Sequence, residues 1–376
     1  MKFTSIKISI LDRYLLNQLI FFFIFSVSLF ASVGVTIGTV SDLTYKINEY
    51  NLPLTFAILV FLLKIPEYTA YALPIGTLLT TLLVYRRLNS DRELIALRSA
   101  GISLYRIMAP AIAFSILITG ITFFFNELVV PAANHQATLL QNPFLGETDF
   151  DLQRKDIFYP EYQDLTSNYR QLKRLYYAEK FDGRQLKNIT IITWSEDKLN
   201  QVITAKFARW NNKQQVWQLI EGQKETLTDS LIFTEIEQFN YQEISLPATF
   251  FKLVTVAKSP EEMNLKQART YLDLIANSNS LKNIRLFQVR IQQKIAFPSI
   301  CFVFALVGAT LGSAHSTINR SQGFGLCVAI VFSYYLVGFM TGSLGIAGLI
   351  SPFLSAWIPN FLGLGVGGSL LKLINN

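Results

Sequence analysis

The sequence has few charged residues. Asp, Glu, Lys and Arg make up 16% of its 376 residues, whereas soluble domains carry about 25%. The deficit is local, because long charge-free runs alternate with an ordinary polar middle segment. Runs of this length can cross a bilayer, which excludes a simple soluble protein. The composition therefore predicts an integral membrane protein that also carries a soluble domain.

Cysteine and histidine are scarce as well. Cys301 and Cys327 both lie in apolar runs, which predicts small packing residues rather than a disulfide or a metal pair. His135 and His315 are far apart, and no metal-ligand spacing surrounds them. The sequence contains no G-x-x-x-x-G-K-[ST] motif and no nucleophile–base pattern, so neither a P-loop nor an enzyme active site is predicted. We expect no metal or cofactor on this chain.

The net charge is +7, which raises the question of an anionic partner. No basic cluster with interleaved aromatic residues occurs, so nucleic-acid binding is not predicted. The excess of Lys and Arg is instead typical of the cytoplasmic loops of a membrane protein.

Six membrane spans are predicted from the apolar runs. Residues 321–371 contain no charged residue and are too long for one span, so we divide them at the glycine-rich segment before Pro352. The predicted spans are residues 15–40, 68–85, 107–126, 295–314, 324–340 and 352–371.

Two further features of the spans suggest roles. Gly34 with Gly38, and Gly308 with Gly312, form G-x-x-x-G pairs, which predict close approach of a second helix. Lys64 and Glu67 interrupt the second apolar run, and an ionisable pair at membrane depth is a functional hypothesis by default. The alternative is that Lys64 extends toward the membrane surface and Glu67 is its local partner.

Between the third and fourth spans the apolar runs shrink to strand length and become rich in β-branched and aromatic residues. Turn signals such as Asp182-Gly183 separate these runs, which predicts a sandwich, barrel or jelly roll over roughly residues 156–256. A helix-like stretch follows. The predicted organisation is spans in 1–130, a β-domain in 131–258, a helical connector in 259–294 and spans in 295–376.

Basic residues in the short loops set the orientation. They fall on one side of the predicted topology, which places both termini in the cytoplasm and the β-domain outside it. These residues are Lys2, Lys7, Arg13, Arg86, Arg87, Arg92, Arg98, Arg320 and Lys372.

Residues 86–101, which we call the coupling loop, join the second and third spans. Ser90 and Glu93 match a capping box, and Gly101 falls where a helix ends in the left-handed conformation. The pattern predicts a short cytoplasmic helix near residues 90–100. It could bind in the groove of a separate motor protein, or it could be only an interfacial amphipathic helix. The candidate contact residues are Arg87, Ser90, Arg92, Glu93, Leu94, Leu97, Arg98 and Gly101.

Motifs along the whole chain resemble the LptF/LptG-type permease family of lipopolysaccharide exporters. The most selective is residues 87–103, RLNSDRELIALRSAGIS. The others are LDRYL at residues 11–15, LPIG at 73–76, NELVVPAAN at 126–134, ARW at 208–210, VWQL at 216–219, KIAFP at 294–298 and WIPN at 357–360.

The resemblance implies six spans with a periplasmic β-jelly roll inserted between helices 3 and 4. It implies two permease subunits, identical or homologous, in the inner membrane with a pair of cytoplasmic ABC ATPase subunits that bind ATP and Mg. Lipopolysaccharide would enter between span one of one subunit and span five of the other. It would then pass to the jelly rolls and along a periplasmic bridge of similar jelly rolls.

The resemblance also assigns residues. The loop helix is similar to the family's coupling helix, and Glu93 matches the acidic residue that meets the ATPase. Family members can carry a basic residue on span one for lipid phosphates, and this chain has none there, so Lys46 and Lys64, with Glu67, are the nearest candidates. A permease for another envelope lipid and a non-transporting membrane-anchored scaffold are the alternatives. Six spans argue against the scaffold, because one anchor helix would suffice.

Overall fold

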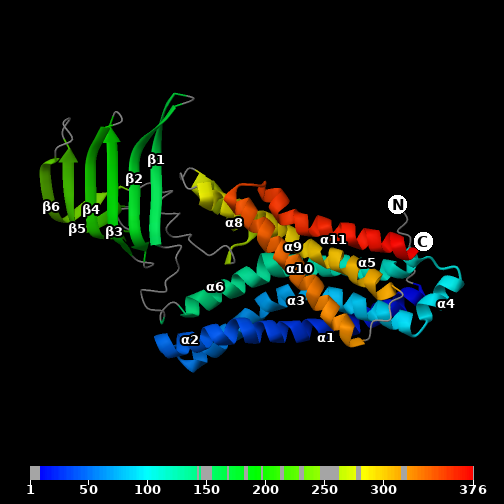
Figure 1. The fold of residues 1–376 in the computed structure, drawn as a ribbon. Helices are drawn as coiled ribbons and strands as arrows, with labels where there is room; N and C mark the ends of the chain where they lie inside the picture. Colours follow the sequence, from blue (N-terminus) through cyan, green and yellow to red (C-terminus); the bar gives the residue numbers. More distant parts are fainter. Residues whose placement is uncertain are drawn as a thin grey trace, which may run out of the picture. The chain divides into compact units, whose positions relative to one another are not determined.

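The computed structural model describes residues 9–141, 144, 155–166, 169–181, 185–195, 198–211, 216–227, 233–245, 262–276, 281–314 and 320–375. Its contacts divide the chain into two compact units. The first contains Met1–Gln141 and Arg285–Asn376, and the second contains Asn142–Ile284. The first unit is helical and the second holds a β-sheet (Figure 1).

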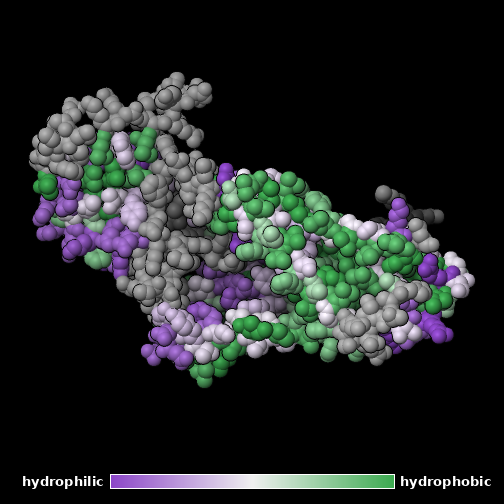
Figure 2. Space-filling model, viewed as in Figure 1, coloured by the Kyte–Doolittle hydropathy of each residue, from purple (hydrophilic) through white to green (hydrophobic). Residues whose placement is uncertain are grey.

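Long apolar helices make up the first unit. Before the sheet come α1 (Ile10–Val35), η1 (Thr36–Val40), α2 (Ser41–Tyr50), α3 (Leu54–Ser90), α4 (Glu93–Ser99), α5 (Leu104–Phe124), η2 (Phe125–Val129) and α6 (Val130–Gln141). After it come α9 (Leu281–Ser313), α10 (Arg320–Ala347) and α11 (Pro352–Asn375). Within the described residues, 6 helical segments are long and apolar enough to cross a membrane, which confirms the predicted spans. Figure 2 shows the apolar surface that they form.

The helices extend well beyond the predicted apolar runs. The first continues through the π-helical turn η1 to Tyr50, and the third continues through η2 to Gln141. α9 begins at Leu281, so it includes much of the predicted connector, and the short helix α8 (Leu265–Ala276) precedes it. Polar residues do not by themselves end a helix, because its backbone hydrogen bonds are internal. The apolar runs therefore cover only part of each helix.

The two G-x-x-x-G pairs both face α3. Gly34 and Gly38 of the first span lie against the ring of Tyr68. A methyl group on Gly312 would lie 2.7 Å from the Leu82 carbonyl oxygen, and one on Gly308 would lie 2.8 Å from the Leu78 carbonyl oxygen. α3 thus packs against α1 on one side and α9 on another, with glycine at both contacts.

α10 and α11 are joined by a short turn and by polar contacts inside the unit. Pro359 lies within α11 and cannot donate a hydrogen bond to the Ser355 carbonyl one turn earlier. The Thr341 hydroxyl of α10 donates to that carbonyl at 2.8 Å. Tyr334 of α10 also donates to Asn360 of α11 at 2.7 Å. The side chains of one helix therefore complete the hydrogen bonding of the other.

The second unit contains one antiparallel sheet in the described residues. Its strands are β1 (Lys155–Thr166), β2 (Tyr169–Phe181), β3 (Gln185–Ser195), β4 (Lys198–Asn211), β5 (Val216–Leu227) and β6 (Phe233–Ile244). They form a 6-stranded sheet in sequential order, β1-β2-β3-β4-β5-β6. Trp217 and Leu219 on β5 are fully buried, in the alternation of a strand with one covered face. The β-domain inserted between the third and fourth spans is confirmed, and predicted strand residues 246–256 lie outside the described residues.

Candidate functional site

The helix α4 is buried on one face and exposed on the other. Leu94 is 1% exposed and, with the partly buried Leu97, packs into the core cluster that includes Leu15 of α1. Ile95 is 43% exposed, and Arg98 is exposed beside it. Figure 1 places α4 at the same end of the helical unit as the start of α1 and the end of α11. Among the described residues, this end therefore presents a short helix whose inner face is buried and whose outer face is exposed.

The predicted capping box at Ser90 and Glu93 is wrong. A capping box needs an extended residue at the N-cap, whereas Ser90 is the last residue of α3. The chain reverses after it, and the N-cap of α4 is Arg92, in the left-handed conformation at φ 61° with no side-chain cap. At the end of α3 the Arg87 carbonyl accepts from the Asp91 amide at 2.9 Å, and the Arg87 guanidinium pairs with the Asp91 carboxylate at 3.5 Å.

The end of α4 follows the prediction. Gly101 has φ +87°, so the left-handed end is confirmed. Its amide donates to the Arg98 carbonyl at 3.0 Å, and the Ile102 amide donates to the Leu97 carbonyl at 3.1 Å. This pair of bonds is a Schellman motif, and Leu97 and Ile102 both pack on the same core cluster. The chain therefore leaves α4 in a fixed direction toward α5.

A true capping box starts α1, and the sequence-based prediction missed it. The Ser9 hydroxyl accepts from the Asp12 amide at 3.3 Å, and the Asp12 carboxylate accepts from the Ser9 amide at 3.2 Å. The S-x-x-D pattern of Ser9-Ile-Leu-Asp12 was the available signal.

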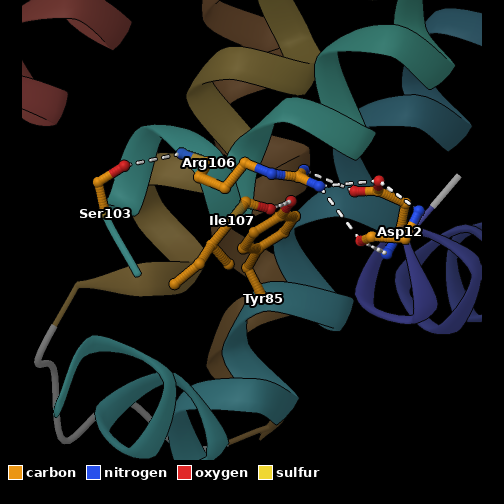
Figure 3. Close-up of polar contacts among 6 residues, drawn as sticks. Asp12, Tyr85, Ser103, Arg106 and Ile107 are labelled. Atoms are coloured by element: carbon orange, nitrogen blue, oxygen red, sulfur yellow. Dashed lines mark hydrogen bonds and ion pairs between the residues drawn. The ribbon is translucent and has the colours of Figure 1, made fainter. Parts of the chain in front are cut away.

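The same Asp12 carboxylate binds the guanidinium of Arg106 through both oxygens, at 2.6 and 2.8 Å (Figure 3). Arg106 also donates to the Ser9 hydroxyl at 3.2 Å, and its backbone amide is capped by Ser103 at 3.3 Å. The first turn of α5 is thereby joined to the first turn of α1. Because this fork geometry needs a guanidinium, Lys could not replace Arg106 without losing one of the two bonds.

Glu93 contacts α1 as well. The Tyr14 hydroxyl lies 2.9 and 3.1 Å from the two Glu93 carboxylate oxygens and donates to them. No pattern in the sequence marked this contact, because the two residues are 79 positions apart. The first residue of α4 is thus held by the first span rather than by a cap of its own.

Two further contacts connect the coupling loop to neighbouring helices. The Asn89 amide donates to the carbonyl of Ala314, just after α9, at 3.0 Å. Arg86 lies against Gly323 of α10, where an added methyl group would come within 2.8 Å of the guanidinium. The coupling loop therefore contacts the end of α9 and the start of α10, in addition to its contact with α1.

The candidate lipid-contact residues lie away from α4. Lys46 donates to Asp42 at 2.8 Å and to Gln141 at 2.7 Å, which joins α2 to the end of α6. Lys64 and Glu67 form an ion pair at 2.8 Å within α3, and both side chains are partly exposed. This pairing is compatible with both interpretations, because the Lys64 ammonium is still partly exposed.

Cys301 and Cys327 are free and buried, so the prediction of packing residues is confirmed. Within the described part of the chain, no group of three or more His, Cys, Asp or Glu side chains could hold a metal ion.

A comparison with models of protein families gives a match over most of the chain. The model for the lipopolysaccharide export system permease LptF/LptG matches residues 13–373. The chain belongs to the LptF/LptG family. A comparison with curated protein sequences found no match. As an LptF/LptG permease the chain is a multi-pass inner-membrane protein, a transport subunit rather than an enzyme, and it works with partner subunits. The match covers α1 from Arg13 onward, the coupling loop and the sheet, so Tyr14, Glu93 and Arg106 lie within the LptF/LptG region, while Ser9 and Asp12 lie just before it.

Proposed function

We propose that this chain is the permease subunit of an ATP-driven transporter that extracts lipopolysaccharide from the inner membrane. Membership of the LptF/LptG family supports the permease role. The observation that carries the coupling to ATP is α4, whose inner face is buried in the helical unit while its outer face is exposed. A partner that moves α4 must also move the helices on which Leu94 is seated.

The partner that fits this face is a cytoplasmic ABC ATPase dimer, which would bind ATP and Mg. A helix that presents Ile95 between Arg92 and Arg98 suits a groove with an apolar floor and an acidic rim. Glu93 adds one carboxylate at the start of the helix, where a partner's guanidinium or ammonium could bind it. The contact is centred on residues 93–98.

A second permease subunit, identical or homologous, would complete the membrane part. In the most apolar stretch of α1 and of α10, only 11% of the residues are buried inside the structure, compared with 67% in that of α9. These two helices therefore have the most apolar surface left for a partner or for lipid chains. This supports lateral entry of the lipid between span one of one subunit and span five of the other.

The anionic groups of the lipid require cations near the spans. Lys64 is the candidate on α3, because its ammonium has three donors and Glu67 takes one of them. Lys46 is a second candidate, with two of its donors already used. From there the lipid would pass to the periplasmic β-domain and to a bridge protein of similar build, with both termini of this chain in the cytoplasm.

The test is to replace the charged residues of α4. Glu93→Gln and Arg98→Gln should each weaken copurification with the ATPase about tenfold, because they remove charges from a docking surface. Glu49→Gln, an exposed carboxylate on α2, is the matched control. Release of lipopolysaccharide from proteoliposomes should fall in proportion to ATPase association. Association and export that stay normal in both α4 variants would refute the assignment.

Native mass spectrometry of the complex tests the substrate in the same preparation. We expect two ATPase subunits and a retained lipopolysaccharide. A different retained envelope lipid would refute the substrate and leave the permease role in place.

A further inference from the structure

The LDRYL segment at residues 11–15 has a tyrosine whose contact the proposed function does not use. Tyr14 lies in the first turns of α1, and its hydroxyl donates to both oxygens of Glu93, at 2.9 and 3.1 Å. Glu93 is one of the charged residues of α4 that we place against the ATPase. A residue of the first span therefore binds the side chain that faces the motor.

Glu93 needs this support because its own helix gives it little. α4 has seven residues, and so short a helix is not stable in isolation. Its N-cap, Arg92, makes no side-chain cap and is left-handed. The orientation of the Glu93 carboxylate is thus set by the buried Leu94 next to it and by the hydroxyl of Tyr14.

The hydrogen bond leaves Glu93 able to bind a partner. A carboxylate has about four acceptor positions, and the single Tyr14 proton is shared between the two oxygens on one side. The remaining positions can accept from a guanidinium or ammonium. Positioning by Tyr14 and binding of the ATPase are therefore compatible, and the first strengthens the second by reducing the freedom that Glu93 loses on docking.

A second attachment makes the link between α1 and the coupling loop stiff. Asp12, two residues before Tyr14, holds Arg106 at the start of α5 by two bonds of 2.6 and 2.8 Å. The segment from Glu93 to Arg106 is thus joined to the first turns of α1 at both of its ends. Displacement of α4 must displace α1, or else break these contacts.

We propose that Tyr14 is a positioning residue that holds Glu93 toward the ATPase and transmits the motion of α4 to the first span. This inference rests on the proposed function, since it concerns how the same contact works. It adds a role for a residue that does not itself touch the ATPase.

The experiment is a double-mutant cycle on the full permease complex, with the affinity for the ATPase as the first measurement. Tyr14→Phe removes only the hydroxyl and should weaken association about fivefold. Glu93→Gln keeps an acceptor for Tyr14 and removes the charge. In the Glu93→Gln background, Tyr14→Phe should have no further effect. Tyr45→Phe, an exposed tyrosine further along the same continuous helix, is the control and should leave the affinity unchanged.

The second measurement is the lipopolysaccharide released per ATP hydrolysed, at saturating ATPase. Tyr14→Phe should lower this ratio about threefold while ATP hydrolysis continues, a separation that a general loss of stability would not give.

The outcomes separate the two proposals. If Glu93→Gln leaves association intact, the motor contact itself is wrong. If Glu93→Gln weakens association and Tyr14→Phe does not, or if Tyr14→Phe weakens it equally in both backgrounds, the role of Tyr14 is wrong. An unchanged release ratio in Tyr14→Phe overturns the transmission to the first span.

Discussion

Gly101 sets the direction in which the chain leaves α4. Its φ of +87° is a conformation that costs an L-amino acid about 1–2 kcal/mol. Gly101→Ala should therefore destabilise the permease by about that amount, since a methyl group there meets nothing within 4 Å and the cost is conformational alone.

Gly120→Ala is the control for this prediction. Gly120 also has nothing within 4 Å of an added methyl group, but it lies in the middle of α5. Thermal unfolding in detergent should show a lower Tm for Gly101→Ala and an unchanged or higher Tm for Gly120→Ala. Equal Tm values for Gly101→Ala and the parent chain would contradict the strained conformation.

Also at the residue scale, changes to the Lys64–Glu67 ion pair can distinguish a structural role of Lys64 from a role in lipid binding. Lys64→Gln should lower the free energy of unfolding by only about 1 kcal/mol, because the pair is partly exposed. The Tm should therefore fall slightly. If Lys64 also holds a lipid phosphate, the same change should weaken lipopolysaccharide binding about tenfold.

Exchanging the two charges, Lys64→Glu with Glu67→Lys, tests both statements together. The exchange restores an ion pair and should restore the Tm, but it puts a carboxylate in place of the ammonium. Lipid binding should then stay weak. Recovery of both properties would show that the pair is structural only.

Around the coupling loop, sequence patterns predicted the conformation or contacts of some residues and not of others. Gly101 was predictable because a glycine after an amphipathic stretch has one common conformation. Ser90 was not, because the same S-x-x-E letters occur where α3 continues through Ser90 and α4 begins only after the left-handed Arg92. The Tyr14–Glu93 contact could not be found at all without the fold.

At the scale of elements, the contact of α9 with α3 depends on glycine. A methyl group on Gly312 would lie 2.7 Å from the Leu82 carbonyl oxygen and 3.0 Å from the Arg86 amide nitrogen, both backbone atoms. Gly312→Ala should therefore force the helices apart and cost about 1–3 kcal/mol.

The control for the α9 contact is Gly325→Ala in α10, where nothing lies within 4 Å of the added methyl group. Denaturation in detergent, followed by circular dichroism, should separate the two variants clearly. A Gly312→Ala protein as stable as the control would show that α9 and α3 can move apart without cost.

The elements themselves were largely predictable. Apolar runs gave the six spans, because only sustained hydrophobicity keeps a helix in lipid. Helix lengths were not predictable in this way: α9 continues through Lys294, Arg290 and Arg285 toward its start at Leu281, since charge does not interrupt internal backbone bonds. The turn signals predicted the short strands of a sandwich, barrel or jelly roll, but not the sequential order in which the described strands pair in one sheet.

At the scale of the whole molecule, the proposed topology places α4 and the β-sheet on opposite sides of the membrane. Single cysteines at exposed positions test this. We expect an impermeant thiol reagent to label Asn240→Cys on β6 in cells with a permeable outer membrane. Ser99→Cys on α4 should be labelled only after the inner membrane is opened.

The native chain provides the background for the labelling, because Cys301 and Cys327 are both fully buried and should not react. Labelling of both engineered positions from the same side would contradict the topology.

The hydrogen bond from Thr341 to the Ser355 carbonyl has a consequence for biosynthesis. Alone in lipid, α11 would expose a carbonyl that Pro359 cannot satisfy, at a cost of several kcal/mol. Paired with α10 it carries no such cost. Residues 321–371 contain no charged residue that would separate the insertion of α10 from that of α11. We therefore expect the membrane insertion machinery to release the two helices together, as a hairpin in which this hydrogen bond has already formed.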